Sequence, residues 1–434
     1  MRRPLPGVWQ PGDHPGRRKF AALFGENGNE LALEGGGSLP EVSVAYETWG
    51  ELDRARSNAV LVLHALTGDS HAVGPAGPGH LTAGWWDGMI GPGAPIDTDR
   101  YFVVCPNVLG GCQGTTGPAS AAPDGRPYGS RFPQVTVRDQ VALEVALADH
   151  LRIDRWAGVV GGSMGAMRVL EWCVGYPERV NRAVVIAVGA AATADQIALC
   201  SLQVRAIRSD PAFAGGDYYG TADRPLDGLT IARGIGQVSY RTGYELQSRS
   251  GRRAQAPEEP LKGGRFAVES YLEYHGDKLA GRFDPNSYVV LSEAMNHHDI
   301  GRGRGGVAGA LVRVSAEVTV VGISSDRLYP LALQRELAQV LPGDRPVTVI
   351  ESASGHDGFL LEIDQLGPVV ASALNERVRV SLVAPTSQLL DGDLELDVLA
   401  GQLRTALGAR STAEGSTFTR RLPVRSTTCS SVTS

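Results

Sequence analysis

The sequence lacks the features that mark several large classes of protein. No apolar run approaches the roughly 20 residues that a membrane-spanning helix needs, so no membrane partner is expected. The N-terminus, MRRPLPGVWQPGDHPGRRKF, is basic but has no apolar segment typical of a secretory signal. The five cysteines are scattered and no pair has CxxC spacing, which predicts neither a disulfide framework nor a zinc site. These absences predict a cytoplasmic protein.

Lysine is also scarce, and the chain has no excess of positive charge. Only Lys19, Lys262 and Lys278 are lysines among 41 basic residues, a skew that a GC-rich genome explains without any function. The formal net charge is −6 and the pI is about 5.9, so no nucleic-acid partner is expected. Hydrophobic residues make up 42% of the 434 residues and charged residues 20%, which predicts a globular protein with a sizeable core.

Apolar runs alternate with helical patterns over two separate stretches of the chain. Continuously apolar runs such as 59–63 indicate strands buried on both faces, and a first edge strand is expected near 31–33. The strand–helix–strand rhythm predicts a mostly parallel sheet. It is absent from about 190 to 310, where helix-forming stretches predominate, and it returns near 311.

This rhythm divides the chain into four predicted parts. Residues 1–190 and 311–376 form the two halves of a sheet domain. Residues 191–310, called the insertion below, form a helical lid between them. The C-terminal extension, 377–434, ends in a Ser/Thr-rich segment and is expected to be partly disordered.

Ser163 is the candidate nucleophile. It lies in Gly161-Gly162-Ser163-Met164-Gly165, a G-x-S-x-G motif that follows an apolar strand and opens a predicted helix at 164–176. A nucleophile elbow requires this strand–turn–helix setting, because flanking glycines permit the sharp turn that exposes the hydroxyl. The alternative is an ordinary turn that happens to contain a serine.

A serine nucleophile needs an oriented base, and in this arrangement the chain order is serine, then an acid, then histidine. Asp326 and His356 follow predicted strands in that order. The alternatives are a helix cap for Asp326 and a solvated loop position for His356. The backbone N–H groups of Met164 and Leu66 are the candidates for the oxyanion hole, since one donor follows the nucleophile and the other follows an earlier strand.

No metal is expected. His64, His71 and the run His297-His298-Asp299 contain metal-ligating residue types, but none belongs to a complete ligand set at a recognisable spacing.

With these residues identified, the sequence resembles the homoserine O-acetyltransferase family over roughly residues 20–375, and most closely its actinobacterial branch. The motifs that carry the resemblance are HALTGDSH (64–71), GWWDGMIGPG (84–93), NVLGGCQGTTGP (107–118), RDQV (138–141), GGSMGAMRVLEW (161–172), YLEYHGDKLAGRFDPNSYVVL (271–291), MNHHDIGRGRGG (295–306), SSDRLYP (324–330) and GHDGFL (355–360).

The resemblance implies an α/β-hydrolase fold with a mostly parallel central sheet and an inserted helical lid domain. It also implies transfer of an acetyl group from acetyl-CoA to the side-chain hydroxyl of L-homoserine in methionine biosynthesis. The implied mechanism is ping-pong through an acyl-serine. Acetyl-CoA is then a co-substrate, no cofactor is bound, and the protein is a homodimer that associates through its lids.

The resemblance further implies residues that recognise the amino-acid substrate. Arg233 matches the family position that binds the carboxylate, with Arg241 as the second choice, and Asp357 would bind the ammonium. Tyr240 would add a hydroxyl to the pocket, or it would only pack within the lid. The stretch 243–260 matches the family poorly, which leaves its lid contacts open.

Three other functions remain open from the sequence. A related acyltransferase would use succinyl-CoA as donor, or serine or a deacetylated antibiotic as acceptor. A serine esterase would use the same triad with water as acceptor. A non-catalytic binding protein would need none of Ser163, Asp326 and His356, so the presence of all three speaks against it.

Overall fold

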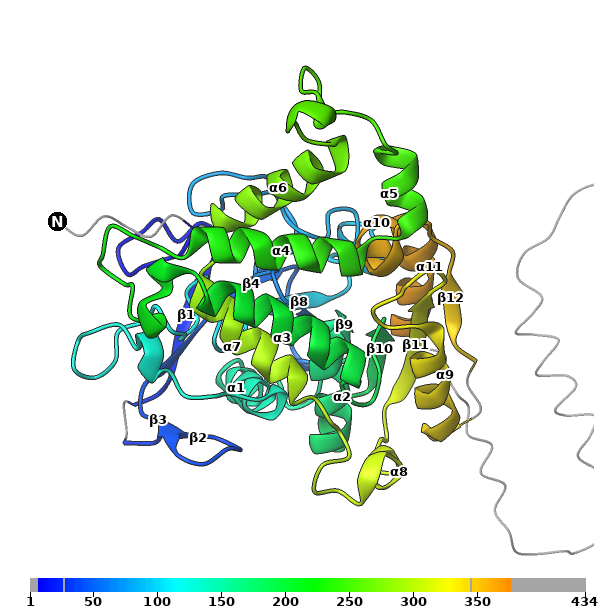
Figure 1. The fold of residues 1–434 in the computed structure, drawn as a ribbon. Helices are drawn as coiled ribbons and strands as arrows, with labels where there is room; N and C mark the ends of the chain where they lie inside the picture. Colours follow the sequence, from blue (N-terminus) through cyan, green and yellow to red (C-terminus); the bar gives the residue numbers. More distant parts are fainter. Residues whose placement is uncertain (1–6, 26–27, 344–345, 376–434) are drawn as a thin grey trace, which may run out of the picture. The chain divides into compact units, whose positions relative to one another are not determined.

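A central sheet organises the protein in the computed structural model, which describes residues 7–25, 28–343 and 346–375 (Figure 1). Its strand order is β1-β4-β8-β5-β9-β10-β11-β12. The bounds are β1 Lys19–Phe24, β4 Val42–Trp49, β5 Ala59–Leu63, β8 Phe102–Pro106, β9 Gly158–Gly162, β10 Arg182–Ile186, β11 Glu317–Ile323 and β12 Thr348–Ile350. The pairs β1–β4 and β4–β8 are antiparallel and the remaining pairs are parallel, which confirms the predicted mostly parallel sheet.

Two apolar cores cover the two faces of this sheet. Strand β5 is fully buried, and its alternate residues belong to different cores: Leu61 and Leu63 pack on the face of α1 (Val137–His150) and α2 (Met164–Gly175). Val60 and Val62 pack on the opposite face, where α11 (Ile363–Leu374) lies. Burial on both faces explains why the strand is continuously apolar. Helix α9, Leu331–Val340, packs against β11.

Helices fill the segment between β10 and β11. They are α3 (Ala194–Arg208), α4 (Leu226–Tyr240), α5 (Gly243–Arg249), α6 (Ala267–Ala280), α7 (Pro285–Asn296) and α8 (Gly306–Leu311). Helix α4 packs on α3 and α6, and α3 packs on α7, so that these helices form a layer beside the sheet (Figure 1). The helical character expected of the insertion is present, and its treatment as a separate lid domain stays a prediction.

The N-terminal region differs from its prediction. The edge strand is β1, not a strand near 31–33. Residues Leu31–Ala32 (β2) instead pair with Ser38–Leu39 (β3) in a separate two-stranded sheet. The sequence signal of β1 is weak because only Ala21 of its six residues is buried, so that no alternation of apolar and polar residues appears.

The remaining short elements are β6 (Ile90–Gly91), β7 (Ile96–Asp97) and α10 (Gly358–Leu361). Among the described residues, no helix combines the length and apolarity that crossing a bilayer requires. The predicted extension at 377–434 lies outside the described residues.

Candidate active site

Ser163 occupies the sharp turn between β9 and α2. Its backbone has φ 56° and ψ −126°, a conformation that non-glycine residues rarely adopt. The turn is tight because α2 lies directly on β5: a Cβ atom at Gly165 would be 2.0 Å from the carbonyl oxygen of Leu63. Strain of this kind is characteristic of functional sites, where the surrounding structure holds it in place.

Ser163, His356 and Asp326 form one hydrogen-bonded chain. The Nε2 atom of His356 is 2.8 Å from Oγ of Ser163, and its Nδ1 atom is 2.6 Å from Oδ2 of Asp326. The other carboxylate oxygen of Asp326 accepts hydrogen bonds from the backbone N–H groups of Leu328 and Tyr329, both at 2.8 Å. These bonds fix the carboxylate, and they are not a helix cap, because α9 begins only at Leu331.

The surroundings of His356 favour its protonated form. Burial by itself lowers the pKa of the imidazole, but the charge of Asp326, the hydrogen bond to it and the charge of Asp357 together outweigh burial. The pKa of His356 is therefore raised above its ordinary value of 6.5. Such a group can accept a proton from a serine hydroxyl and then hold the positive charge that results.

Both predicted oxyanion donors lie beside the serine. Met164 is the first residue of α2, so its N–H has no acceptor within the helix. Leu66 lines the same cavity as Ser163, and within the described part of the chain its N–H has no hydrogen-bond acceptor. The loop that carries Leu66 is held by Arg168, which donates to the carbonyl of His64, and by Arg282, which donates to that of Thr67.

A cavity of about 110 Å³ opens above the serine and is lined by Arg233, Tyr240 and Asp357, whereas Arg241, the second choice for the carboxylate, does not line it. Arg233 and Tyr240 reach it from α4, and Asp357 reaches it from the loop after β12. The Tyr240 ring centroid lies 6.0 Å from that of His356, and the Arg233 guanidinium lies over the ring at 5.4 Å. Tyr240 therefore both lines the pocket and packs within the insertion.

One face of α3 also lines this cavity, through residues that the sequence analysis did not select. They are Gln196, Leu199, Cys200 and Gln203. The last three lie three, four and seven residues after Gln196, which places all four on one face of the helix. This spacing is the sequence signal from which the four residues could have been selected together.

The two candidate arginines differ in their partners. Arg241 is paired with two carboxylates: its Nη2 lies 3.0 Å from Oδ2 of Asp357, and its Nη1 lies 3.1 Å from Oε1 of Glu245. Arg233 has no carboxylate partner among the described residues, and its guanidinium lies 5.4 Å from the centre of the Tyr240 ring. Of the two candidates, Arg233 is therefore the one whose charge no carboxylate of the described residues pairs. Two further arginines, Arg302 and Arg304 in the motif at 295–306, are paired with Glu34 and Glu171.

The candidate metal-ligating histidines are engaged in hydrogen bonds. His64 is buried, which lowers its pKa to about 3, and its Nε2 accepts from the N–H of Val108. His297 and His298 bond to the carbonyls of Glu293 and Gly189.

The structure brings together a buried group that the sequence did not indicate, Glu47 with His71 and His80. Their potential ligand atoms lie within 4.8 Å of one another. His71 Nδ1 already bonds to Glu47 at 3.0 Å, and His80 Nε2 accepts from the backbone N–H of Arg17 at 2.9 Å. The rings of His71 and His80 are stacked at 3.8 Å, so their lone pairs do not converge on one point. The prediction that no metal is bound stays a prediction.

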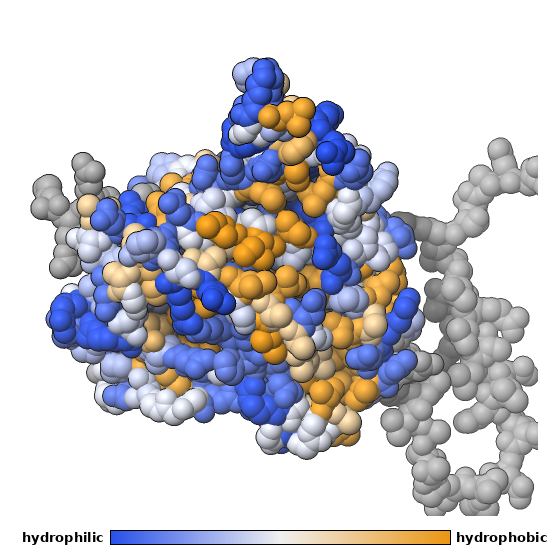
Figure 2. All heavy atoms as spheres, in the orientation of Figure 1, coloured by the Kyte–Doolittle hydropathy of each residue, from blue (hydrophilic) through white to orange (hydrophobic). Residues whose placement is uncertain are grey.

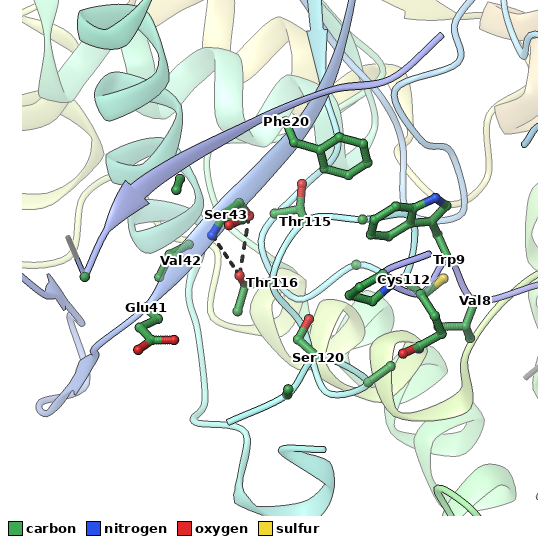
Figure 3. A pocket seen from close by; sticks show the side chains of 18 of the residues that line it. Val8, Trp9, Phe20, Glu41, Val42, Ser43, Cys112, Thr115, Thr116 and Ser120 are labelled. Carbon is green, nitrogen blue, oxygen red and sulfur yellow. Dashed lines mark hydrogen bonds between the residues drawn. The ribbon is translucent and has the colours of Figure 1, made fainter. Parts of the chain in front are cut away.

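A larger cavity of about 580 Å³ lies away from the triad, between residues 8–11, β1, β4 and the loop 111–121 (Figure 3). None of its lining residues belongs to the triad or to the predicted substrate residues. Thr115 and Thr116 line this cavity, and Figure 3 shows Thr116 bonded to Ser43 of β4.

The strand order, the strained serine and the Ser–His–Asp chain are those of an α/β hydrolase. Residues 58–363 match the family model described as the alpha/beta hydrolase fold. A homoserine O-acetyltransferase of Thermobifida fusca (strain YX) is 60% identical over 377 residues, which cover 86% of this chain and 98% of the relative. The chain therefore belongs to the homoserine O-acetyltransferase family, as its sequence motifs predicted.

Solved structures agree with this membership. A homoserine O-acetyltransferase of Bacillus anthracis superposes with a TM-score of 0.75 at 28% identity, covering 83% of this chain and 97% of that one. Esterase E22 superposes equally well, with a TM-score of 0.75 at 26% identity, covering 82% and 99%. The same fold is thus used by a transferase and by an esterase.

Proposed function

We propose that this protein transfers an acetyl group from acetyl-CoA to the side-chain hydroxyl of L-homoserine, giving O-acetyl-L-homoserine and CoA in methionine biosynthesis. The observation that carries the proposal is the 60% identity to a homoserine O-acetyltransferase over 98% of that relative, together with the hydrogen-bonded Ser163–His356–Asp326 chain. Acetyl-CoA is a co-substrate, and the chemistry needs no bound cofactor.

In the first half-reaction, the Ser163 oxygen attacks the thioester carbonyl carbon while His356 Nε2 takes the serine proton. The Leu66 and Met164 N–H groups stabilise the oxyanion that forms. The carbon–sulfur bond then breaks, and the proton on His356 goes to the departing sulfur, so that CoA leaves as a thiol. Asp326 orients the imidazole and stabilises its positive charge. Ser163 is left as an acetyl ester.

In the second half-reaction, His356 takes the proton of the homoserine hydroxyl, whose oxygen attacks the acetyl carbon. The bond to Ser163 breaks and the serine regains its proton from His356. Arg233 binds the homoserine carboxylate, because it is the unpaired cation beside the pocket and a guanidinium suits bidentate recognition of a carboxylate. Asp357 binds the ammonium, and Tyr240 contributes to the same wall.

Ester hydrolysis is the second candidate, and the likeness to esterase E22 favours it. Water would then replace homoserine as the acceptor. Burial of Ser163 and His356 favours transfer, because it limits the access of water to the acyl-serine.

One assay separates these functions. The protein is incubated with acetyl-CoA or succinyl-CoA, with and without L-homoserine or L-serine, and free thiol is followed. Continuous release that requires both acetyl-CoA and homoserine supports the proposal, whereas release independent of an acceptor indicates hydrolysis. Release with succinyl-CoA or serine indicates a related acyltransferase. The control is Ser163→Ala, which should release no thiol with any donor.

We also propose that the protein is a homodimer that acts in the cytoplasm. Apolar side chains gather on the outer face of α3 and α4 in Figure 2, including Ile197, Leu202, Ile231 and Val238. Ile231 is 57% exposed and Leu202 is 54% exposed, and an apolar patch of this kind favours association with a second copy.

A further inference from the structure

The loop that carries His356 is held from two sides. On the core side, Ser325 Oγ donates to the carbonyl of Ser352 at 2.6 Å and accepts from the N–H of Gly355 at 3.0 Å. On the other side lie residues 240–242, where α4 ends and α5 has not yet begun. We call residues 353–357 the histidine loop and residues 240–242 the connector.

The connector contacts the histidine loop at three successive points. Thr242 Oγ1 donates to the carbonyl of Ala353 at 2.6 Å, and Arg241 Nη2 bonds to Asp357 Oδ2 at 3.0 Å. Between these bonds the backbones meet: a Cβ atom at Gly355 would lie 2.3 Å from the carbonyl oxygen of Tyr240, and Gly355 has φ +68°. His356 therefore lies between two residues that the connector binds.

The ion pair between Arg241 and Asp357 couples the position of the connector to that of the histidine loop. Arg241 and Asp357 are only 12% and 16% exposed, so water screens their attraction less than it would at the surface. Arg241 is fixed in turn by Glu245 on α5. The side chain that holds Asp357 is thus part of the insertion, whereas Asp326, which holds the imidazole itself, is part of the sheet domain.

We propose that Arg241 and Thr242 are positioning residues, which set the place of the His356 imidazole by binding the two ends of its loop. The inference rests on the proposed acetyl transfer. His356 moves the proton in both half-reactions, so a displaced loop slows acylation of Ser163 and transfer to homoserine together. Misplacement of a catalytic group by a fraction of an ångström to one ångström has a large effect on rate.

The test compares Thr242→Val, Thr242→Ser and Arg241→Gln in the full chain. Two rates are measured for each variant: the burst of thiol release with acetyl-CoA alone, and the steady-state kcat with homoserine. We expect Thr242→Val to lower both rates by about fivefold, the effect of one lost hydrogen bond, and Thr242→Ser to restore them because it keeps the hydroxyl. Arg241→Gln should lower both by about tenfold or more, because a charge-assisted bond is lost.

Arg249→Gln is the matched control. Arg249 also pairs with Glu245, at 2.9 Å, but it is half exposed and, within the described part of the chain, forms no hydrogen bond or ion pair with the histidine loop. It should leave both rates within twofold of the unchanged protein. Thermal melting of each variant separates a displaced loop from an unfolded protein.

Three outcomes would overturn the proposal: unchanged rates in Thr242→Val and Arg241→Gln, a loss that Thr242→Ser shares, or a rise confined to the KM for homoserine. The last outcome would mean that Arg241 acts on substrate binding alone. Absence of homoserine-dependent release in the unchanged protein would instead contradict the proposed function itself.

Discussion

In the proposed mechanism, the protonation of His356 sets the pH range in which acetyl transfer can occur. Its pKa is raised because the charges of Asp326 and Asp357 outweigh the effect of burial. The protonated imidazole cannot accept the proton of Ser163, so activity is lost as the pH falls through this raised value.

We therefore expect the acid limb of the pH profile for the thiol burst to have its midpoint above 6.5. Asp357→Asn should move this midpoint to lower pH, because it removes one of the charges that stabilise the imidazolium. The burst is measured without homoserine, so a defect in substrate binding does not affect it. A midpoint at or below 6.5 in the unchanged protein would contradict the expectation.

At Arg233 the prediction concerns one substrate only. Arg233→Gln should raise the KM for homoserine by about tenfold to a hundredfold, since a charged hydrogen-bonding pair contributes about 1.5–3 kcal/mol. The thiol burst with acetyl-CoA alone should stay within twofold, because the carboxylate is absent from that half-reaction. Arg208→Gln is a suitable comparison, since Arg208 lies on the neighbouring helix α3 and pairs with Glu293 away from the cavity. A lost burst in Arg233→Gln would contradict the carboxylate role.

At the scale of elements, the contact between α2 and β5 determines the shape of the turn that holds Ser163. Gly165→Ala would place a methyl group against the carbonyl of Leu63, so the helix must shift away from the strand. We expect the free energy of unfolding to fall by about 1–3 kcal/mol, as in other overpacked cores. Chemical denaturation measures this change.

Gly234→Ala is the control for this effect. Gly234 lies within α4, where the added Cβ would meet no described atom within 4 Å apart from its chain neighbours and the backbone of its own helix. Alanine favours a helix over glycine by about 1 kcal/mol, so this variant should be as stable as the unchanged protein or more stable. If Gly165→Ala unfolds at the same denaturant concentration as the unchanged protein, the close contact between Gly165 and Leu63 does not determine the shape of the turn.

Elements with strong local patterns could be predicted from the sequence to within a residue. The buried strand at 59–63 has the predicted bounds, because a continuous apolar run defines it, and the helix predicted at 164–176 spans Met164–Gly175. The order of Ser163, Asp326 and His356 along the chain could also be recognised in the sequence, and their catalytic roles stay a prediction. The edge strand at 19–24 was missed because an exposed edge needs little apolar surface.

Features that depend on the packing of distant elements could not be predicted in this way. The face of α3 that lines the cavity depends on how that helix lies against the sheet domain. The pairing of Arg241 with Asp357 joins residues 116 positions apart, and no local pattern records it. The same is true of Glu47 with His71 and His80.

At the scale of the whole molecule, the apolar face of α3 and α4 is the proposed dimer interface. Ile231→Asp would put a charge on that face, and burying an unpaired charge at an interface is costly. We expect the mass measured by light scattering to fall from that of two chains to that of one. Leu81→Asp is the control, because Leu81 is 67% exposed but lies outside the insertion. A monomeric mass for the unchanged protein would contradict the dimer.

The separation of Ser163 from His356 by 193 residues also determines when the site can form. The ribosome adds about 5–20 residues per second, so the nucleophile is made about 10–40 seconds before its base. During this interval the nascent chain holds a serine with no base to activate it. Contacts between such distant parts of a chain are also slow to form during folding. Acylation of Ser163 therefore begins only after synthesis has passed residue 356 and both halves of the sheet have joined.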